Sequence, residues 1–118
     1  MVGVIPGFIE MTPKLVDFGY CENELLKDCF LGKQGERFRG HEFHYSRWDA
    51  QGLEPIHRVE KKRRQSSRPE GYQRGNLLAS YVHCHFLSYP QRALNLIESA
   101  GNFANPIGHV EAVQGAKQ

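Results

Sequence analysis

The most informative part of the chain is the run Gly75-Asn76-Leu77-Leu78-Ala79-Ser80-Tyr81-Val82-His83-Cys84-His85-Phe86. Its apolar and aromatic residues predict a strand that places an imidazole, that of His83, at its end. Successive side chains of an extended segment point to opposite faces, so His83 and Cys84 are expected to diverge rather than form a nucleophile and base pair. Cys84 is therefore predicted to be a small buried apolar residue.

Upstream of this run, the sequence predicts a β-rich meander. A short β-branched strand is expected at Met1 to Pro6, and a second brief strand at Cys21 to Leu26. The segment Arg37 to Trp48 is rich in aromatic residues and approximately alternating, which predicts another strand. One face of this strand is expected to carry the three rings of His41, Phe43 and Tyr45.

Two further strands are predicted at Leu53 to Lys62 and Gly71 to Val82. The polar stretch Arg63 to Glu70 is interpreted as a mobile connection between them. The basic run within Arg58 to Arg64 is diluted by nearby glutamates and has no interleaved aromatic residues. It therefore predicts a solvated hairpin tip rather than a nucleic-acid surface.

One helix is predicted near the end of the chain. Ser88 is expected to cap it, with Gln91 reaching back in a capping box and Pro90 tolerated in the first turn. Gly101 is the predicted C-terminal stop, and the tail 102–118 is predicted to be flexible because it has little apolar periodicity. Four residues are expected to share one face of the helix, namely Ala93, Leu94, Ile97 and Ala100.

The composition suits one soluble domain or a piece of one, with 118 residues, 40% of them hydrophobic and 24% charged. The three cysteines form no CxxC pair and no signal peptide precedes them, which favours a reducing cytoplasm. The apolar stretches are shorter than the roughly 20 residues that span a bilayer, so no membrane partner is expected. The net charge of +2 predicts no particular partner.

Four runs of the sequence occur in the order in which they are found in the cobyrinic acid a,c-diamide synthase family. They are Met1 to Gly7 with Met11-Thr12, Phe18 to Tyr20, Arg39 to Ser46, and Ala79 to Phe86. The chain thus resembles the C-terminal part of the class I glutamine amidotransferase-like domain of this family. The resemblance implies an α/β fold of partial flavodoxin-like type, β-rich with one C-terminal helix, in which residues 1–101 form the domain part.

The resemblance assigns the catalytic histidine to His83. In the chemistry of the family, a cysteine thiolate attacks the glutamine amide, and the histidine carries protons between the nucleophile, the departing ammonia and water. Imidazole titrates near neutrality, which suits proton transfer in both directions. The nucleophile is expected on a glycine-rich turn upstream, and neither Cys21 nor Cys29 occupies such a segment. The chain is therefore expected to contain no nucleophile.

Other residues of the matching runs are candidates for supporting roles. His85 stands where many class I amidotransferases have a glutamate that orients the imidazole, so Glu42 is considered for that orienting role. The remaining possible supporting or cleft residues are His41, His44 and Tyr81. Histidines and cysteine are also zinc ligands, but the HxxH spacing on a strand sends its two rings to opposite faces, so no metal site is predicted.

ATP binding is not expected within the chain, because no GxxxxGK[ST] phosphate loop occurs in it. The resemblance implies ATP and Mg²⁺ for the full-length enzyme, glutamine and a corrin precursor as substrates, and the upstream half of the synthase, in cis or in trans, as partner. The chain would then be a C-terminal glutaminase fragment that is inactive alone. Two alternatives are a non-catalytic remnant that acts as an interaction module and a related synthase that acts on another tetrapyrrole.

Overall fold

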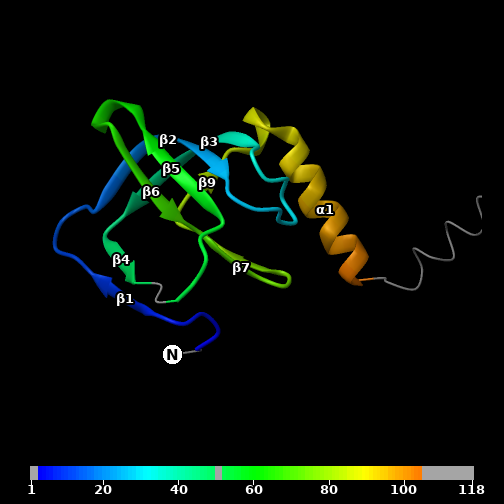
Figure 1. Ribbon diagram of the computed structural model, residues 1–118, viewed down its shortest axis with the longest axis horizontal. Helices are drawn as coiled ribbons and strands as arrows, with labels where there is room; N and C mark the ends of the chain where they lie inside the picture. Colours follow the sequence, from blue (N-terminus) through cyan, green and yellow to red (C-terminus); the bar gives the residue numbers. More distant parts are fainter. Residues whose placement is uncertain (1–2, 50–51, 105–118) are drawn as a thin grey trace, which may run out of the picture.

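A computed structural model describes residues 3–49 and 52–104, in which a five-stranded antiparallel sheet is accompanied by one α-helix (Figure 1). The strand order is β6-β5-β2-β3-β9. The strands are β2 (Asp17–Leu25), β3 (Arg37–His44), β5 (His57–Lys61), β6 (Ser66–Glu70) and β9 (His83–Cys84). The predicted α/β fold, β-rich with a C-terminal helix and consistent with a partial flavodoxin-like domain, is confirmed.

Smaller elements flank the main sheet. Strand β1 (Phe8–Met11) pairs with β4 (Ser46–Asp49), and β7 (Tyr72–Arg74) pairs with β8 (Leu77–Ala79). Two 3-10 helices follow strands β5 and β9, namely η1 (Lys62–Arg64) and η2 (Phe86–Ser88). The long helix α1 (Pro90–Ala104) closes the described chain and lies at one end of the sheet (Figure 1).

The register of the central strands gives the sheet two different faces. Tyr20 of β2, His41 of β3 and His83 of β9 lie in one cross-strand row. Side chains alternate along each strand, so this row and every second residue beside it share a face. We call this the aromatic face and define it by Phe18, Tyr20, His41, Phe43 and His83. The opposite side is called the buried face.

The apolar core lies on the buried face and is small. Its fully or nearly buried members are Cys21, Leu25, Phe38, Ile56, Val59 and Tyr72. Helix α1 packs against this face through Arg92, whose guanidinium lies 3.5 Å from the centroid of the Phe38 ring. On the aromatic face, by contrast, the Tyr20 side chain is 86% exposed. The described residues therefore cover only one side of the sheet.

The strand predicted at Met1 to Pro6 is wrong for the part of it that the structure describes. Residues 3–6 form no strand, and the first strand begins at Phe8. The cause is local, since Gly3 and Gly7 have φ angles of 65° and 126°, which are incompatible with a regular strand. Residues 1–2 lie outside the described part. The strand predicted to begin at Cys21 in fact begins at Asp17.

The stretch Arg63 to Glu70 is not a mobile connection, contrary to the prediction. The chain leaves η1 through Gln65, which has a φ of 47°, and then forms β6. All five residues of β6 pair with β5, from Ser66 opposite Lys61 to Glu70 opposite His57. A proline within this strand is tolerated because β6 is at the edge of the sheet, where a backbone N–H is not needed.

Three predicted strands are divided or shortened in the structure. The segment Arg37 to Trp48 provides β3 and β4, which belong to different sheets. The segment Gly71 to Val82 forms the β7–β8 hairpin, whose turn includes Gly75 with a φ of 56°. His83 follows in its own strand, β9. The strand expected at Leu53 to Lys62 is limited to β5.

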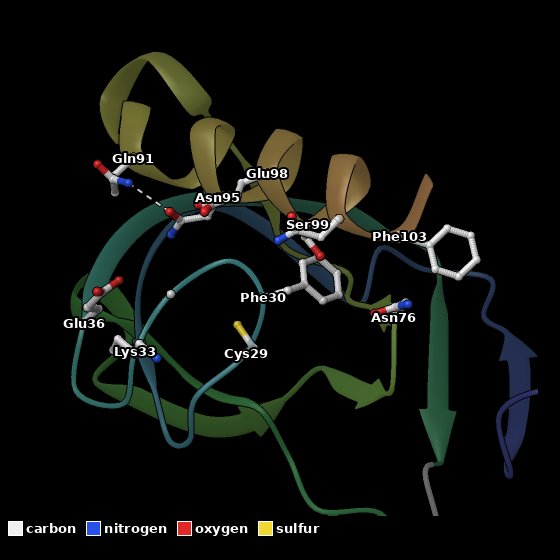
Figure 2. A pocket seen from close by; sticks show the side chains of 12 residues that line it. Cys29, Phe30, Lys33, Glu36, Asn76, Gln91, Asn95, Glu98, Ser99 and Phe103 are labelled. Carbon is white, nitrogen blue, oxygen red and sulfur yellow. Dashed lines mark hydrogen bonds between the residues drawn. The ribbon is translucent and has the colours of Figure 1, made fainter. Parts of the chain in front are cut away.

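The predicted capping box of the helix is also wrong. Helix α1 begins at Pro90, and the Ser88 hydroxyl instead donates to the His85 carbonyl oxygen at 2.7 Å, within η2. The Gln91 amide donates to Asn95 Oδ1 at 2.9 Å, one turn further along the helix (Figure 2). The helix continues through Gly101 to Ala104, so residues 102–104 of the predicted tail are helical and residues 105–118 lie outside the described part.

The apolar stripe of α1 does not face the sheet. Leu94 and Ile97 are 58% and 68% exposed, whereas Arg92 is 2% exposed. The contacts of Arg92 with Phe38 and of Asn95 with the carbonyl oxygen of Leu31 fix the rotation of the helix. In neither described range does a helix have the length and hydropathy required to cross a membrane.

Candidate active site around His83

His83 lies on the aromatic face, in the edge strand β9. Its side chain is exposed, and its ring centroid is 6.3 Å from that of His41, its partner across the strands. Strand β9 has only two residues, so the position of His83 depends on β3 and on the bend that precedes β9. An exposed imidazole at this edge is accessible to groups that approach from outside the sheet.

Aromatic rings surround His41 on the same face. The centroids of Tyr20 and Phe18 lie 5.4 and 6.0 Å from that of His41, and both rings meet it edge to face. Phe43 continues the cluster at 6.2 Å from Phe18, and Tyr45 follows at 5.7 Å from Phe43. Such edge-to-face contacts favour fixed ring orientations. The aromatic face therefore holds His41 beside His83.

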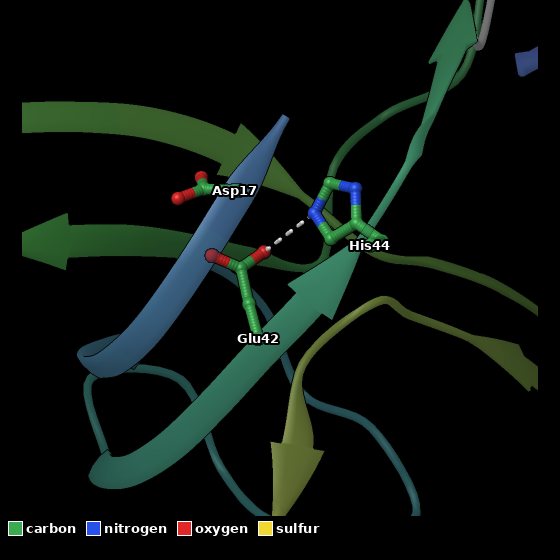
Figure 3. A group of neighbouring side chains, drawn as sticks. All are labelled: Asp17, Glu42 and His44. Atoms are coloured by element: carbon green, nitrogen blue, oxygen red, sulfur yellow. Dashed lines mark ion pairs between the residues drawn. The ribbon is translucent and has the colours of Figure 1, made fainter. Parts of the chain in front are cut away.

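Glu42 points away from His83, because it neighbours His41 in β3 and so projects to the buried face. There its fully buried carboxylate lies 3.1 Å from Lys61 Nζ, and it also accepts a hydrogen bond from Arg68. His44 Nε2 is 3.6 Å from Glu42 Oε1 (Figure 3). The structure corrects the hypothesis that Glu42 orients His83, since the two side chains lie on opposite faces.

Asp17 and Glu42 form an ion-pair cluster with three cations, of which Arg64 contacts Asp17 alone. Lys61 and Arg68 each contact both carboxylates. Burial raises the pKa of Asp17, but the hydrogen bond from Lys61 and the neighbouring positive charges lower it, and the net effect is a pKa below the usual range. Asp17 is thereby held in its charged form.

The same carboxylates raise the question of a metal site. Asp17, Glu42 and His44 each offer one ligand atom, and these atoms lie within 4.8 Å of one another (Figure 3). The buried Lys61 and the half-buried Arg68 already neutralise both carboxylates, so a divalent cation would have to displace these two positive charges. The geometry is that of an ion-pair network. His41 and His44 point to opposite faces, as predicted.

Among the described residues, Tyr81 and His85 make no ring contact with His41 or His83. Tyr81 stacks on His44 with centroids 4.0 Å apart, and its hydroxyl is 2.7 Å from Ser46 Oγ. His85 is exposed just after β9, where its carbonyl oxygen accepts hydrogen bonds from Ser88. Of the proposed supporting residues, His41 is thus the one with a ring contact to His83 in the described structure.

The three cysteines do not share the aromatic face with His83. Cys21 and Cys84 both lie opposite Gly40, in the row next to that of His83, so Cys84 diverges from His83 as predicted. Burial raises the pKa of both thiols, which disfavours the nucleophilic thiolate. Cys84 is only half-buried. Cys29 lies in the loop between β2 and β3 (Figure 2).

Two cavities flank the sheet without including His83. The larger, of about 810 Å³, lies between α1 and the β2–β3 loop and is lined by polar residues such as Lys33, Glu36 and Asn95 (Figure 2). The smaller, of about 480 Å³, is mainly apolar and is lined by residues that include Trp48 and Tyr81. His83 lines neither cavity and stands on the open sheet surface.

Sequence reasoning missed a polar group that adjoins the His83 segment. Glu70, His57 and Ser80 come from β6, β5 and the bend before β9, and their side chains meet within 3.2 Å of one another. No sequence spacing links the three residues, and the composition of the stretch that ends at Glu70 predicts a mobile connection and not a strand. The pairing of His57 with Glu70 in the β5–β6 hairpin is the one local signal, and it depends on the register.

Comparison with known proteins identifies relatives of the chain. The sequence pattern of the CobB/CobQ-like glutamine amidotransferase domain matches residues 1–91. The cobyrinate a,c-diamide synthase of Limosilactobacillus reuteri (strain DSM 20016) is 39% identical over 106 residues, which cover 86% of this chain and 23% of the relative. That of Listeria monocytogenes serovar 1/2a is 48% identical over 90 residues, covering 73% of this chain and 20% of the relative.

A third relative extends the comparison, the cobyrinate a,c-diamide synthase of Salmonella typhimurium (strain LT2), which is 35% identical over 85% of this chain. The chain spans between 20% and 23% of the length of these three relatives. No solved structure gives a significant match. The match over residues 1–91 confirms the resemblance on which the interpretation of His83 rests, and the chain belongs to the family of CobB/CobQ-like glutamine amidotransferase domains.

Proposed function

We propose that the chain is the histidine-bearing C-terminal part of the glutaminase domain of a cobyrinate a,c-diamide synthase. Such an enzyme uses ATP to activate carboxylates of a corrin precursor and ammonia from glutamine to convert them into amides. The observation that supports the proposal is the position of His83, an exposed imidazole on the aromatic face within the segment that matches the family. Relatives that carry the name cobyrinate a,c-diamide synthase support the substrate class.

His83 would serve as the proton carrier of glutamine hydrolysis. It would take the proton of a cysteine thiol as the sulfur attacks the amide carbon, and give that proton to the departing ammonia as the C–N bond breaks. It would then take a proton from water as the water oxygen attacks the thioester carbon, and give that proton to the sulfur as the C–S bond breaks, which releases glutamate and restores the thiol. An imidazole suits both steps because its two protonation states interconvert near neutral pH.

The cysteine nucleophile, the ATP site and its Mg²⁺ are proposed to belong to other segments of the synthase, in cis or in trans. The raised pKa values of the Cys21 and Cys84 thiols, and their location on the buried face, support a nucleophile from elsewhere. The open aromatic face supports an approach of the missing segment from that side. On this proposal the isolated chain, in the cytoplasm or in vitro, has negligible glutaminase activity.

The test is His83→Ala in the complete synthase, with Arg58→Ala as the control because Arg58 is an exposed residue of the same sheet. Loss of the proton carrier is expected to lower ammonia release from glutamine by about 10²- to 10⁴-fold. Amidation with added ammonium salt should continue, since that reaction does not need the glutaminase. Glutamine hydrolysis by the His83→Ala enzyme at the control rate would refute the proposal.

A second candidate function is a non-catalytic interaction module, and the exposure of the aromatic face favours it. Tyr20 is 86% exposed and Phe18 is 53% exposed, which is typical of surfaces that bind a partner. Two results together would favour this alternative. The chain would bind a partner, and the His83→Ala enzyme would still carry out full glutamine-dependent amidation. Assays with different tetrapyrrole acids in place of cobyrinic acid decide between the proposed substrate and that of a related synthase.

A further inference from the structure

Glu70 and His57 form an almost completely buried polar pair beside the bend that leads to the His83 strand. The side chains of Glu70 and His57 are 4% and 5% exposed, and His57 Nε2 lies 2.9 Å from Glu70 Oε2. They come from the paired strands β6 and β5, where they stand opposite each other. A buried carboxylate is costly unless hydrogen bonds satisfy its oxygens. The partners of Glu70 therefore indicate what this pair holds in place.

The other partners of Glu70 are consecutive residues of the bend that leads to β9. The backbone N–H of Tyr81 donates to Glu70 Oε1 at 2.6 Å, and the hydroxyl of Ser80 donates to Glu70 Oε2 at 2.7 Å. Ser80 Oγ in turn accepts the backbone N–H of Val82 at 2.9 Å. Residues 80–82 are thus tied to one carboxylate directly before His83. Hydrogen bonds to an ionised acceptor are among the stronger ones in proteins.

The neighbouring glycine positions show how tightly this arrangement is packed. A Cβ atom on Gly71, which has a φ of 78°, would lie 2.7 Å from His57 Nε2. A Cβ atom on Gly40 would lie 2.3 Å from Val82 Cγ1 and 3.2 Å from the carbonyl oxygen of His83. The bend is therefore held by Glu70 on one side and by close packing against β3 on the other.

The contact of Ser80, His57 and Glu70 does not have the geometry of a catalytic triad. In a triad the imidazole lies between the hydroxyl and the carboxylate and uses a different nitrogen for each. Here the Ser80 hydroxyl donates to the carboxylate itself, and His57 Nε2 faces both groups. His57 Nδ1 is buried and has no hydrogen-bond partner among the described residues. The group is arranged to fix the backbone rather than to activate Ser80.

We infer that Glu70 is a positioning residue for His83: oriented by His57, its carboxylate fixes the bend at residues 80–82 and so sets where β9 presents the His83 imidazole. This inference rests on the proposed function of His83. Because β9 has only two residues, the bend is the main constraint on His83 apart from its pairing with β3. Small displacements of a reacting group lower rates strongly, so the contribution of Glu70 should be visible in the turnover of glutamine.

The test uses Glu70→Gln in the complete synthase, since this change keeps the size of the side chain but replaces one acceptor oxygen with an amide donor. The kcat of glutamine hydrolysis is expected to fall by about 10- to 100-fold. The KM for glutamine and the amidation with added ammonium salt are expected to stay near their original values. The control is Glu54→Gln, the same chemical change at a side chain that is 87% exposed.

A second measurement reports on the bend itself. Hydrogen exchange of the peptide that contains residues 80–84, measured by mass spectrometry on the same enzymes, should be faster in Glu70→Gln than in Glu54→Gln. If Glu70→Gln does not fold, Ser80→Ala takes its place, because Ser80 is exposed and its hydroxyl links Glu70 to the Val82 amide. Ser80→Ala is then expected to lower kcat in the same direction.

The outcomes separate this inference from the proposed function. An inactive His83→Ala enzyme together with a Glu70→Gln enzyme of unchanged kcat and unchanged exchange overturns the positioning role and leaves the proposed function intact. A His83→Ala enzyme with full glutamine hydrolysis overturns the proposed function, and the positioning role falls with it. Parallel losses of glutamine-dependent and ammonium-dependent amidation in Glu70→Gln would indicate general unfolding, and Ser80→Ala then decides. An unchanged kcat in Ser80→Ala overturns the positioning role, and a selective loss of its glutamine hydrolysis supports it.

Discussion

The charge state of Glu70 connects the geometry near His83 with the stability of the fold. Burial raises the pKa of Glu70, but hydrogen bonds from His57, Tyr81 and Ser80, with the charge of His57, lower it, and the net pKa is below the usual 4.5. A carboxyl group whose pKa is lowered by folding binds fewer protons in the folded state than in the unfolded state. Glu70 thus stabilises the fold above pH 4.5, and this contribution is lost as the pH falls through its folded pKa.

The lowered pKa of Glu70 predicts how acid affects the unfolding free energy of the original chain and of a Glu70→Gln variant. The unfolding free energy of the original chain should decrease as the pH is lowered from 7 to below 4.5, and the Glu70→Gln variant should show a smaller decrease. Asp17, whose pKa is also lowered, contributes in the same direction and remains in both forms. Urea unfolding at several pH values measures the difference. Equal pH dependence in the two forms would contradict the lowered pKa of Glu70.

Gly40 is predicted to be required because it lets β9 approach β3. In Gly40→Ala, the new methyl group would meet Val82 and the carbonyl oxygen of His83, so β9 would have to move. We expect a loss of about 1–3 kcal/mol in unfolding free energy and a clear loss of glutamine hydrolysis in the complete synthase.

A matched glycine offers the control for that substitution. Gly101 lies inside α1 and has no atom within 4 Å of an added Cβ, so Gly101→Ala should be neutral or stabilise the helix by about 0.5–1 kcal/mol. Urea unfolding curves and ammonia release are measured on both variants. If Gly40→Ala loses no more stability and no more ammonia release than Gly101→Ala, the close approach of β9 to β3 is not what positions His83.

At the residue scale, alternation along an extended chain predicted part of the site. It separated His83 from Cys84 and His41 from His44, and both separations are present in the structure. The same alternation places the Glu42 side chain on the opposite face from His41. Whether that is also the opposite face from His83 depends on which strands pair, and the sequence does not show this. The Glu70 network could not be predicted, because its members meet only through the register of separate strands and a bend.

At the scale of elements, two errors of prediction, those at β6 and α1, share one physical cause, which is that hydrophobic periodicity does not describe segments held by polar contacts. Strand β6 contains no apolar residue except proline, and its pairing with β5 defines it. The rotation of α1 is likewise set by Arg92 and Asn95 and not by its apolar stripe. Elements whose apolar residues face the core, such as β2 and β3, were predicted in position, although their ends were not.

Arg92 permits a prediction about how α1 is attached to the sheet. Its guanidinium lies against Phe38, two of its nitrogens have no hydrogen-bond partner in the described residues, and burial lowers its pKa. Arg92→Met keeps much of the contact volume and removes the buried charge, so its unfolding free energy should stay within about 1 kcal/mol of the original or increase. Arg92→Ala leaves a cavity and should lose about 2–4 kcal/mol.

Urea unfolding of the two Arg92 variants distinguishes packing from charge. Cation–π attraction at a desolvated site contributes about 2 kcal/mol, so a large loss in Arg92→Met would mean that this attraction outweighs the cost of burying the charge. Equal losses in Arg92→Met and Arg92→Ala would therefore contradict the packing argument. The far-ultraviolet circular dichroism of both variants shows whether the helix itself persists.

At the scale of the whole molecule, both the sheet and the helix expose apolar side chains. The aromatic face exposes Phe18, Tyr20 and Phe43 at 53%, 86% and 52%, and α1 exposes its apolar stripe. A sheet with one uncovered aromatic face loses the burial that normally stabilises a layered α/β domain. On the proposed function, the segment of the synthase that carries the nucleophile covers the aromatic face, so the proposed active site depends on that segment.

This exposure predicts that the isolated chain associates with itself. Exposed aromatic patches of this kind promote association, so sedimentation velocity should show larger species as the concentration rises. The double variant Tyr20→Glu with Phe43→Glu should shift the distribution toward the monomer, because two charges on the aromatic face oppose its burial. Leu94→Glu, on the exposed stripe of α1, is the control for an apolar-to-charged change elsewhere. A chain that is monomeric throughout, or one in which only Leu94→Glu restores the monomer, would show that the aromatic face is not the surface that requires a cover.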